Sequence, residues 1–533
     1  MAKTAKILVH PNFRIGDISP RLYGAFLEPI GTFVNGSMYN PKHPDADDMG
    51  FRKDFMEMLK ASGLPSVRLP GGNFVSGWDW KDSIGAMEER KTRLDPAWNQ
   101  YIPNDIGHDE YLQWAERTGV ESMYTINLGT GDINDAIKII EYTNHSGVSY
   151  WSDLRRKNGH EKPYGVKTWY LGNEMDGPWQ IGSWLFDPHG YGVRTNEVSK
   201  VMKMIDPSIE TVVCASTSFT APHFPRWDLE VLQQCYQTVD YISLHHYHSA
   251  LPGDYLALLG SSRYFEDYIN TEIAICDYVQ AQYRSPKKIM LSFDEYGTSP
   301  REPTPLNYGR GIYNYLKPFY TFGTPREYVL HDPDNMTVRR PPRGGDMLNA
   351  LTSASTMLAF LRHADRVKIG CMTGGLFALA ATSREHVWKP AAHYSCTHLM
   401  RYGRGVSLKA IVDCDTYDIP GYAMDDTAQF YSLENVDVID TAAAYDEESG
   451  ELNIFVINRN DKEGNVVEID AEAFKGFKFT EHIQLYSEDM DARNTYEQPD
   501  TIIPSVNAEA ECIDGKVTSY LKKLSWNVFC FRK

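Results

Sequence analysis

Two glutamates stand at the ends of short apolar segments, where a carboxyl group can take part in catalysis. Glu174 follows the segment 169–173 (WYLGN) and opens a turn rich in Gly, Pro and Trp, whereas Glu295 closes the segment 288–295. Partial burial raises the pKa of a carboxyl group, as a general acid working near neutral pH requires. The alternative for Glu174 is a residue that only caps the next helix. The position of Glu174 at the end of a predicted strand favours a catalytic role.

Two carboxylates from different strands are the minimum requirement for glycoside hydrolysis. A separation of about 5 Å gives a retaining reaction through a covalent intermediate, and about 6.5–9.5 Å gives inversion. The residues alone leave this choice open. Asp294 directly precedes Glu295. Because neighbouring residues of a strand point to opposite faces, we expect only one of the two to face the mouth of a barrel.

Eight short apolar runs alternate with helix-like segments over the first ~370 residues, which predicts βα units and a parallel sheet. The runs are Leu22–Glu28, Ser66–Pro70, Ser122–Leu128, Lys167–Asn173, Thr211–Ser216, Tyr241–Tyr247, Lys288–Glu295 and Arg366–Met372. The helix-like segments include Phe51–Ala61, Ile133–Asn144, Val193–Ile205 and Met347–His363. Eight strands alternating with helices predict an α/β fold, a (β/α)₈ TIM barrel, whose active site would lie at the carboxyl ends of the strands.

The C-terminal region changes to short alternating segments such as LNIFVINRN and VVEIDAE, which predict an antiparallel, jelly-roll-like β-sandwich. We expect three parts: residues 1–18 as an N-terminal strand joining the sandwich, 19–385 as the catalytic barrel, and 386–533 as the C-terminal sandwich. The long connection 296–345 contains REPTP and RRPPRGG, and loops of this length are typically functional.

The chain carries 53 Lys and Arg against 71 Asp and Glu, a net charge of −18. This balance repels nucleic acid and anionic membranes, so neither is expected as a partner. The first residues lack the apolar core of a secretory signal, and no stretch reaches the ~18 apolar residues of a transmembrane helix. The eight cysteines are scattered without a C-x-x-C pair, which is typical of reduced core residues. We therefore expect a cytoplasmic protein.

A histidine-rich strand end invites a metal hypothesis. His246 and His248 are expected on one face of the strand and His245 and Tyr247 on the other, and no third convergent ligand is evident. We therefore expect no metal. Residues 129–131 (GTG) lack the third glycine of a dinucleotide fingerprint, and no Walker A or G-x-S-x-G motif occurs.

Six longer motifs carry a resemblance to a known family. They are RLPGGNFVSGWDWKD (68–82), LDPAW (94–98), NLGTGD (127–132), YLGNEMDGPWQIG (170–182), SLHHY (243–247) and SFDEYG (292–297). In this order they resemble glycoside hydrolase family 51, the α-L-arabinofuranosidase family of the intracellular type, over essentially the whole chain. The resemblance implies a barrel of the large retaining clan with an attached sandwich.

The resemblance also implies a function and a set of site residues. It implies an exo-acting, retaining enzyme that releases terminal arabinofuranose from arabinan or arabinoxylan oligosaccharides by double displacement, without metal or organic cofactor, and that assembles as a homo-oligomer. By match to the GNE and FDE motifs, Glu174 corresponds to the acid/base and Glu295 to the nucleophile. The positions matching residues that hold or border the sugar are Glu28, Arg68, Asn73, Trp98, Asn173, His245 and Tyr247.

Two positions depart from the family pattern. The family commonly has Trp after the nucleophile, where this chain has Tyr296, and a glutamine on the eighth strand, where this chain has Gly374. Loss of a polar partner beside a sugar changes discrimination between substrates strongly. Two alternatives therefore stay open: a retaining glycosidase of the same fold acting on a β-xyloside, a β-glucan or another furanoside, and a catalytically silent carbohydrate-binding protein.

Overall fold

The computed structural model describes residues 4–306, 316, 326–331 and 345–533. Eight parallel strands in this part of the chain close into a barrel in the order β10-β11-β12-β3-β4-β7-β8-β9. Their bounds are β3 Gly24–Phe26, β4 Ser66–Leu69, β7 Glu121–Ile126, β8 Thr168–Leu171, β9 Glu210–Cys214, β10 Tyr241–Ala250, β11 Met290–Pro300 and β12 Val367–Thr373. Each strand overlaps one of the eight predicted runs, so the predicted barrel is confirmed.

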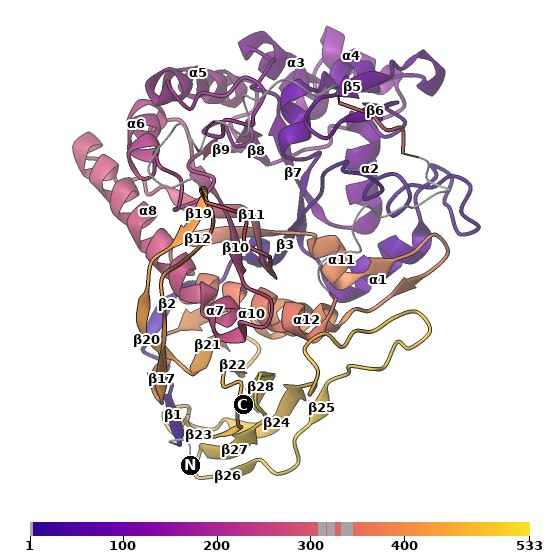
Figure 1. Ribbon diagram of the computed structural model, residues 1–533. Helices are drawn as coiled ribbons and strands as arrows, with labels where there is room; N and C mark the ends of the chain where they lie inside the picture. The colour runs from indigo at the N-terminus through magenta and orange to yellow at the C-terminus, as the bar shows by residue number, and fades with distance from the viewer. Residues whose placement is uncertain (1–3, 307–315, 317–325, 332–344) are drawn as a thin grey trace.

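Helices follow the strands in sequence and surround the barrel (Figure 1). They are α1 Lys53–Ser62, α2 His108–Thr118, α3 Ile133–Asn144, α4 Tyr150–Lys157, α5 Pro188–Ile205, α6 Arg226–Cys235, α7 Tyr255–Leu259, α8 Ser261–Tyr283, α10 Met347–Leu361, α11 Gly375–Leu379 and α12 Ala391–Tyr402. Local signals set their ends: Asp132 caps α3 reciprocally with Asp135, and Gly63 ends α1 at φ 77°.

The barrel interior is filled rather than hollow. Seven buried side chains from its strands form one apolar cluster: Phe26, Met123, Tyr170, Val212, Tyr241, Ile369 and Cys371. Such a layer closes the barrel below its carboxyl end. Polar side chains at the strand ends therefore lie over an apolar floor.

The sandwich packs below the barrel in the view of Figure 1 and consists of a five-stranded and a seven-stranded sheet. The five-stranded sheet has the order β16-β1-β23-β27-β26, with bounds β16 Ile411–Asp413, β1 Ala5–Leu8, β23 Asn465–Asp470, β27 Lys516–Leu521 and β26 Glu511–Ile513. The other has the order β2-β15-β21-β22-β28-β24-β25, with bounds β2 Arg14–Asp17, β15 Val406–Leu408, β21 Ile439–Asp446, β22 Glu451–Asn458, β28 Ser525–Arg532, β24 Lys478–Leu485 and β25 Ser505–Val506. Side chains of both sheets share one core.

The N-terminal segment supplies one strand to each sheet. β1 pairs in parallel with β23, and β2 pairs antiparallel with β15. The parallel pair departs from the expected fully antiparallel sandwich. The reason is topological, because the whole barrel separates β1 from β23 in sequence and no hairpin turn imposes an antiparallel direction.

One part of the C-terminal region lies outside the two large sheets. The hairpin β18 Tyr422–Asp425 and β19 Ala428–Phe430 and the pair β17 Thr416–Ile419 with β20 Leu433–Asp437 form separate two-stranded sheets. We call residues 416–437 the β17–β20 segment. In Figure 1 this orange segment runs up beside α8 to the barrel strands. Its alternating sequence predicts strands correctly but does not indicate that they leave the sandwich.

Helix α12 packs against α10 and α11 in the helical layer of the barrel. We therefore propose that the barrel extends to Tyr402, later than the boundary at residue 385 expected from sequence. Much of the predicted long connection 296–345 lies outside the described residues, apart from the end of β11 and residues 301–306, 316, 326–331 and 345. None of the described helices is long and apolar enough to cross a bilayer.

Candidate active site

The two candidate glutamates meet at the carboxyl end of the barrel. Glu174 follows β8 by three residues, and Glu295 lies within β11. One carboxylate oxygen of Glu174, one of Glu295 and a ring nitrogen of His245 all lie within 4.8 Å of one another. This proximity matches the carboxylate separation of about 5 Å that a covalent, retaining mechanism needs.

Glu174 is held in a backbone conformation that turns it into the barrel mouth. Its φ of 48° lies in the left-handed region, which is costly for a residue with a side chain and is often found at functional sites. Its Oε1 accepts from His245 Nδ1 at 3.0 Å, and its Oε2 accepts from Trp179 Nε1 at 2.5 Å. Burial raises the pKa of Glu174, and the nearby Glu295 charge adds to this shift against the opposing hydrogen bonds.

Glu295 is surrounded by donors. Arg68 Nη1 donates to Oε1 at 2.8 Å, and the Tyr247 hydroxyl donates to Oε2 at 2.8 Å. Thr373, at the end of β12, lies 2.8 Å from the same hydroxyl. These contacts stabilise a carboxylate anion at Glu295 and fix its orientation, as a nucleophile requires.

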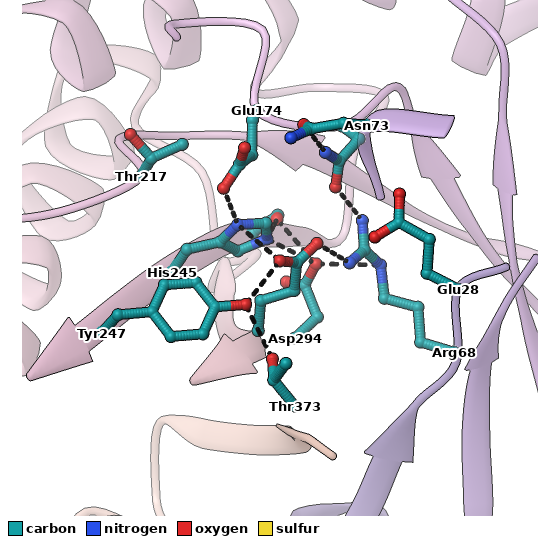
Figure 2. Close-up of polar contacts among 12 residues, drawn as sticks. Glu28, Arg68, Asn73, Glu174, Thr217, His245, Tyr247, Asp294 and Thr373 are labelled. Atoms are coloured by element: carbon teal, nitrogen blue, oxygen red, sulfur yellow. Dashed lines mark hydrogen bonds and ion pairs between the residues drawn. The ribbon is translucent and has the colours of Figure 1, made fainter. Parts of the chain in front are cut away.

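Arg68 connects several of the predicted residues (Figure 2). Besides Glu295, its Nη2 donates to Asn173 Oδ1 at 2.6 Å, and Asn173 Nδ2 donates to Asn73 Oδ1 at 3.0 Å. The guanidinium carbon of Arg68 lies 5.1 Å from the ring centre of Phe26 and 4.9 Å from that of Tyr170. Arg68 is fully buried and pairs with Asp294 and Glu295 of β11.

His245 bridges two carboxylates. Its Nδ1 faces Glu174 at 3.0 Å and its Nε2 faces Asp294 at 3.1 Å. Burial lowers the pKa of His245, but the charges of Glu295 and Asp294 outweigh burial and raise it to about 10. The ring is therefore an imidazolium that donates on both sides.

A β-bulge explains why Asp294 and Glu295 both point toward this cluster. Strand alternation predicted only one inward side chain, yet both contact Arg68. The pairing of β10 with β11 shifts register between Ser243 and His245, where β11 carries one extra residue. Asp294 is fully buried and also accepts from Ser243 and Ser292, and its pKa is lowered because the Arg68 and His245 charges outweigh its desolvation.

Glu28 lies on the other side of Arg68 from Glu174 (Figure 2). Its Oε1 accepts from the backbone N–H of Phe74 and from Trp98 Nε1, both at 2.8 Å. Burial, with a further contribution from the Glu295 charge, raises the pKa of Glu28 to about 8. The carboxyl group is therefore protonated at neutral pH and can donate to a sugar hydroxyl.

Gly72 allows the chain to pass close to both acids. A Cβ atom at this position would lie 2.8 Å from Glu295 Oε1 and 3.2 Å from Glu28 Oε2. Any side chain here would therefore displace a carboxylate.

Glu174, His245 and Glu295 are close enough to hold a metal ion, but their bonding does not suit one. Both nitrogens of His245 face carboxylates, and Arg68 and Tyr247 already donate to both oxygens of Glu295. A metal would require a neutral imidazole with a free lone pair. The donor set fits an organic substrate better.

All nine predicted site residues gather at this end of the barrel, and four further residues belong with them. Trp179 contacts Glu174, Gln180 Nε2 donates to Asn73 Oδ1 at 2.8 Å, Asp294 holds His245, and Thr373 contacts Tyr247. Trp179 and Gln180 lie five and six residues after Glu174 in one Gly-Pro turn, a signal that the sequence offered.

The two departures from the family pattern differ in their surroundings. Tyr296 is buried in the core, where its ring lies 5.0 Å from that of Phe360, and so it does not face the sugar site. A Cβ at Gly374 would meet no atom within 4 Å, although φ of 73° disfavours a side chain there. Only Gly374 therefore leaves space beside the strand end.

Comparisons with known proteins agree with this geometry. Residues 57–267 match the model of an alpha-L-arabinofuranosidase 1 domain, and residues 327–525 match that of an alpha-L-arabinofuranosidase C-terminal domain. The chain is 37% identical to an intracellular exo-alpha-(1->5)-L-arabinofuranosidase of Halalkalibacterium halodurans, with 99% of both chains covered. It is 36% identical to a Bacillus subtilis protein named intracellular exo-alpha-(1->5)-L-arabinofuranosidase 1, over 100% of this chain and 99% of the relative.

Solved structures show the same architecture. A family 51 alpha-L-arabinofuranosidase from Bifidobacterium longum superposes with a TM-score of 0.83 at 27% identity, covering 99% of both chains. An alpha-L-arabinofuranosidase from Thermotoga maritima, solved as an arabinose complex, gives the same TM-score and identity over 99% of this chain and 100% of that one. Together with the closed barrel and the attached sandwich, these matches show that the chain belongs to the α-L-arabinofuranosidase family, glycoside hydrolase family 51.

Proposed function

We propose that the protein is an exo-acting, retaining α-L-arabinofuranosidase that releases terminal arabinofuranose from arabinan or arabinoxylan oligosaccharides. The observation that carries this proposal is the pair of carboxyl groups, one with a raised pKa and one saturated by donors, within 4.8 Å of each other. The names of the two bacterial relatives describe exo action on α-(1→5)-linked L-arabinofuranosides, which supports this substrate class.

In this mechanism Glu295 attacks the anomeric carbon while protonated Glu174 gives its proton to the departing oxygen. A covalent arabinosyl ester of Glu295 forms, and the leaving sugar departs as an alcohol. Glu174, now ionised, takes a proton from a water molecule that attacks the ester carbon and releases arabinose. The positive charge of His245 stabilises Glu174 during its ionised phase.

The residues around the pair would hold the ring. Arg68 and Tyr247 orient Glu295, while Asn173, Asn73 and Gln180 form a fixed amide chain next to it. Protonated Glu28 and the Trp98 ring border the space on the side away from Glu174. Both glutamates are present and correctly spaced, which argues against a silent binding protein.

Replacement of each glutamate tests the assignment. We expect Glu295→Ala to abolish turnover of 4-nitrophenyl α-L-arabinofuranoside, and Glu174→Ala to slow it by roughly 10²- to 10⁴-fold. Added azide should produce arabinosyl azide of retained configuration with the Glu174 variant only, because its covalent intermediate lacks a base to activate water. A fully active Glu295→Ala enzyme would contradict the proposal. Hydrolysis of an aryl β-xyloside or β-glucoside in preference to the arabinofuranoside would favour the other-sugar alternative.

Two further features stay predictions. Relatives named intracellular support a cytoplasmic location, in agreement with the reduced state expected for the cysteines. The family resemblance implies a homo-oligomer.

A further inference from the structure

A pocket of about 380 Å³ adjoins Glu174 on the side away from Glu28 and Arg68. Glu174, Trp179, Thr217 and Tyr247 form its inner wall. Figure 2 shows Thr217 on one side of Glu174, with Glu28 and Arg68 on the opposite side. Because the acid protonates the departing oxygen, space beyond Glu174 lies where the leaving group must be.

The outer wall of this pocket comes from the C-terminal region. Thr427 and Ala428, at the tip of the β18–β19 hairpin, line it together with Ser299 and Arg301 from the end of β11. The hairpin is about 250 residues from Glu174 in sequence. The barrel residues alone do not indicate that the C-terminal region supplies this wall.

Several hydrogen bonds fix the hairpin against the barrel. The Tyr422 hydroxyl lies 2.8 Å from His248 Nε2, and Thr220 Oγ1 donates to the Thr427 carbonyl at 2.8 Å. The Phe430 ring packs on His248, with ring centres 4.5 Å apart. The hairpin is therefore anchored to the loop after β9 and to the end of β10, and its tip is held in place without a ligand.

Arg301 is the cation that lines this pocket. Its Nη2 donates to Asp425 at 2.8 Å, and 36% of its side-chain surface stays exposed. A guanidinium group that faces a polar pocket can donate to an acceptor oxygen of a ligand. Asp425 neutralises the charge of Arg301, so the pair favours a hydroxylated, uncharged ligand over an anionic one.

We propose that this pocket binds the sugar that leaves, and that the β18–β19 hairpin, through Arg301, selects a neutral sugar as the leaving group. The proposal rests on the proposed function, because it places a sugar beyond Glu174. Arg301 is a specificity-determining residue, and Tyr422 is a positioning residue that acts through the hairpin. If the leaving group is not a sugar, it does not bind to Arg301, and hydrolysis of that substrate should depend on neither Arg301 nor Tyr422.

The test compares two substrates that give the same arabinosyl intermediate, α-(1→5)-L-arabinobiose and 4-nitrophenyl α-L-arabinofuranoside. The measured quantity is the ratio of their kcat/KM values, disaccharide over aryl glycoside. We expect Arg301→Met to lower this ratio about tenfold, since a lost hydrogen bond from a charged group is of that size. Asp425 keeps its bonds from the Thr427 N–H and hydroxyl, both 2.7 Å, so the hairpin tip stays satisfied.

Tyr422→Phe and Tyr417→Phe form a matched pair. Both remove one hydroxyl of the β17–β20 segment, but the Tyr422 hydroxyl contacts His248, which lines the pocket, whereas the Tyr417 hydroxyl donates at 3.1 Å to the carbonyl of Leu256, which does not. We expect Tyr422→Phe to lower the ratio a few-fold and Tyr417→Phe to leave it unchanged. Transfer of arabinose from the aryl glycoside to methyl α-L-arabinofuranoside should fall in the same order, because the acceptor would occupy the same pocket.

Three results would overturn the proposal. They are an unchanged ratio in a folded Arg301→Met enzyme, an equal fall in Tyr417→Phe, and a ratio that falls while sugar transfer does not. Absence of aryl arabinofuranoside turnover in the unmodified protein would instead contradict the proposed function, so the two failures are distinguishable.

Discussion

At the scale of single residues, the site contains carboxyl groups whose environments separate their protonation states. Asp294 is ionised between Arg68 and His245, whereas Glu28 and Glu174 have raised pKa values. Separated pKa values assign different tasks to chemically equal groups. The imidazolium of His245 connects the ionised and the protonated acid and stabilises the change in charge at Glu174.

The raised pKa of Glu28 should make the folded protein less stable as the pH rises. Its folded pKa of about 8 lies above the ordinary value of 4.5, so between these values the folded protein holds a proton that the unfolded chain has lost. The free energy of unfolding therefore falls with pH across this window. We expect Glu28→Gln to remove this fall, so that its stability relative to the parent increases from pH 5 to pH 8 by a few (~2–4) kcal/mol.

The same variant should keep most of its activity, because the Gln amide, like a protonated carboxyl group, offers an oxygen acceptor to Trp98 and a donor toward a sugar. Urea unfolding at pH 5 and pH 8 measures the first effect, and kcat/KM for the aryl arabinofuranoside measures the second. A stability difference that is constant over this pH range would contradict the raised pKa.

At the scale of elements, the loop after β4 brings backbone against the acids. We expect Gly72→Ala to lower kcat by at least about tenfold, because the new methyl group would lie 2.8 Å from Glu295 Oε1 and 3.2 Å from Glu28 Oε2 and would displace at least one carboxylate. The melting temperature should change little, since displaced carboxylates can rotate toward the open pocket side. A Gly72→Ala enzyme with a normal kcat would contradict this prediction, because it would show that the loop backbone moves to make room and the two carboxylates stay in place.

The elements also show how far sequence reasoning reaches. Each barrel strand is recognisable because strands covered on both faces form continuous apolar runs, and the acids are predictable because they end such runs. The bulge at Asp294 is not predictable, since it depends on the register of β10 against β11. The separation of β18 and β19 from the sandwich is equally hidden, because alternation indicates a half-buried strand but not the surface that buries it.

Individual site residues divide in the same way. The match of motifs indicated His245 and Tyr247, whose partners lie on other strands, but gave no role to Asp294 or Trp179. Each role depends on a contact between distant segments. Residue type and order cannot supply such a contact.

At the scale of the whole molecule, an ionic cluster joins the barrel to the sandwich. Asp440 of β21 is buried between Arg362 Nη1 at 2.7 Å and Arg459 Nη2 at 2.5 Å, and Ser355 of α10 donates to it at 2.7 Å. The two arginine charges outweigh desolvation and lower the pKa of Asp440. Its contribution to stability is therefore present above the ordinary aspartate pKa and is lost as the pH falls below it.

We expect Asp440→Asn to destabilise the protein by about 3–5 kcal/mol, because two buried guanidinium groups lose their partner. Calorimetry at pH 7 should show a lower melting temperature, whereas the exposed Asp500→Asn control should behave like the parent. Activity at low temperature should persist, since no residue of the cluster lines the pocket beside Glu174. A wild-type melting temperature for Asp440→Asn would contradict the role of the cluster.

The two N-terminal strands have a consequence for the order in which the molecule can be made. During synthesis β1 and β2 leave the ribosome before the barrel, but their partners β15, β16 and β23 are made only after the entire barrel. A nascent chain therefore carries two unpaired strand segments while several hundred residues fold between them. Their brevity, four residues each, limits the exposed edge that could join another nascent chain. The sandwich is thus the last part to close, and its closure depends on a barrel that brings the two ends of the polypeptide together.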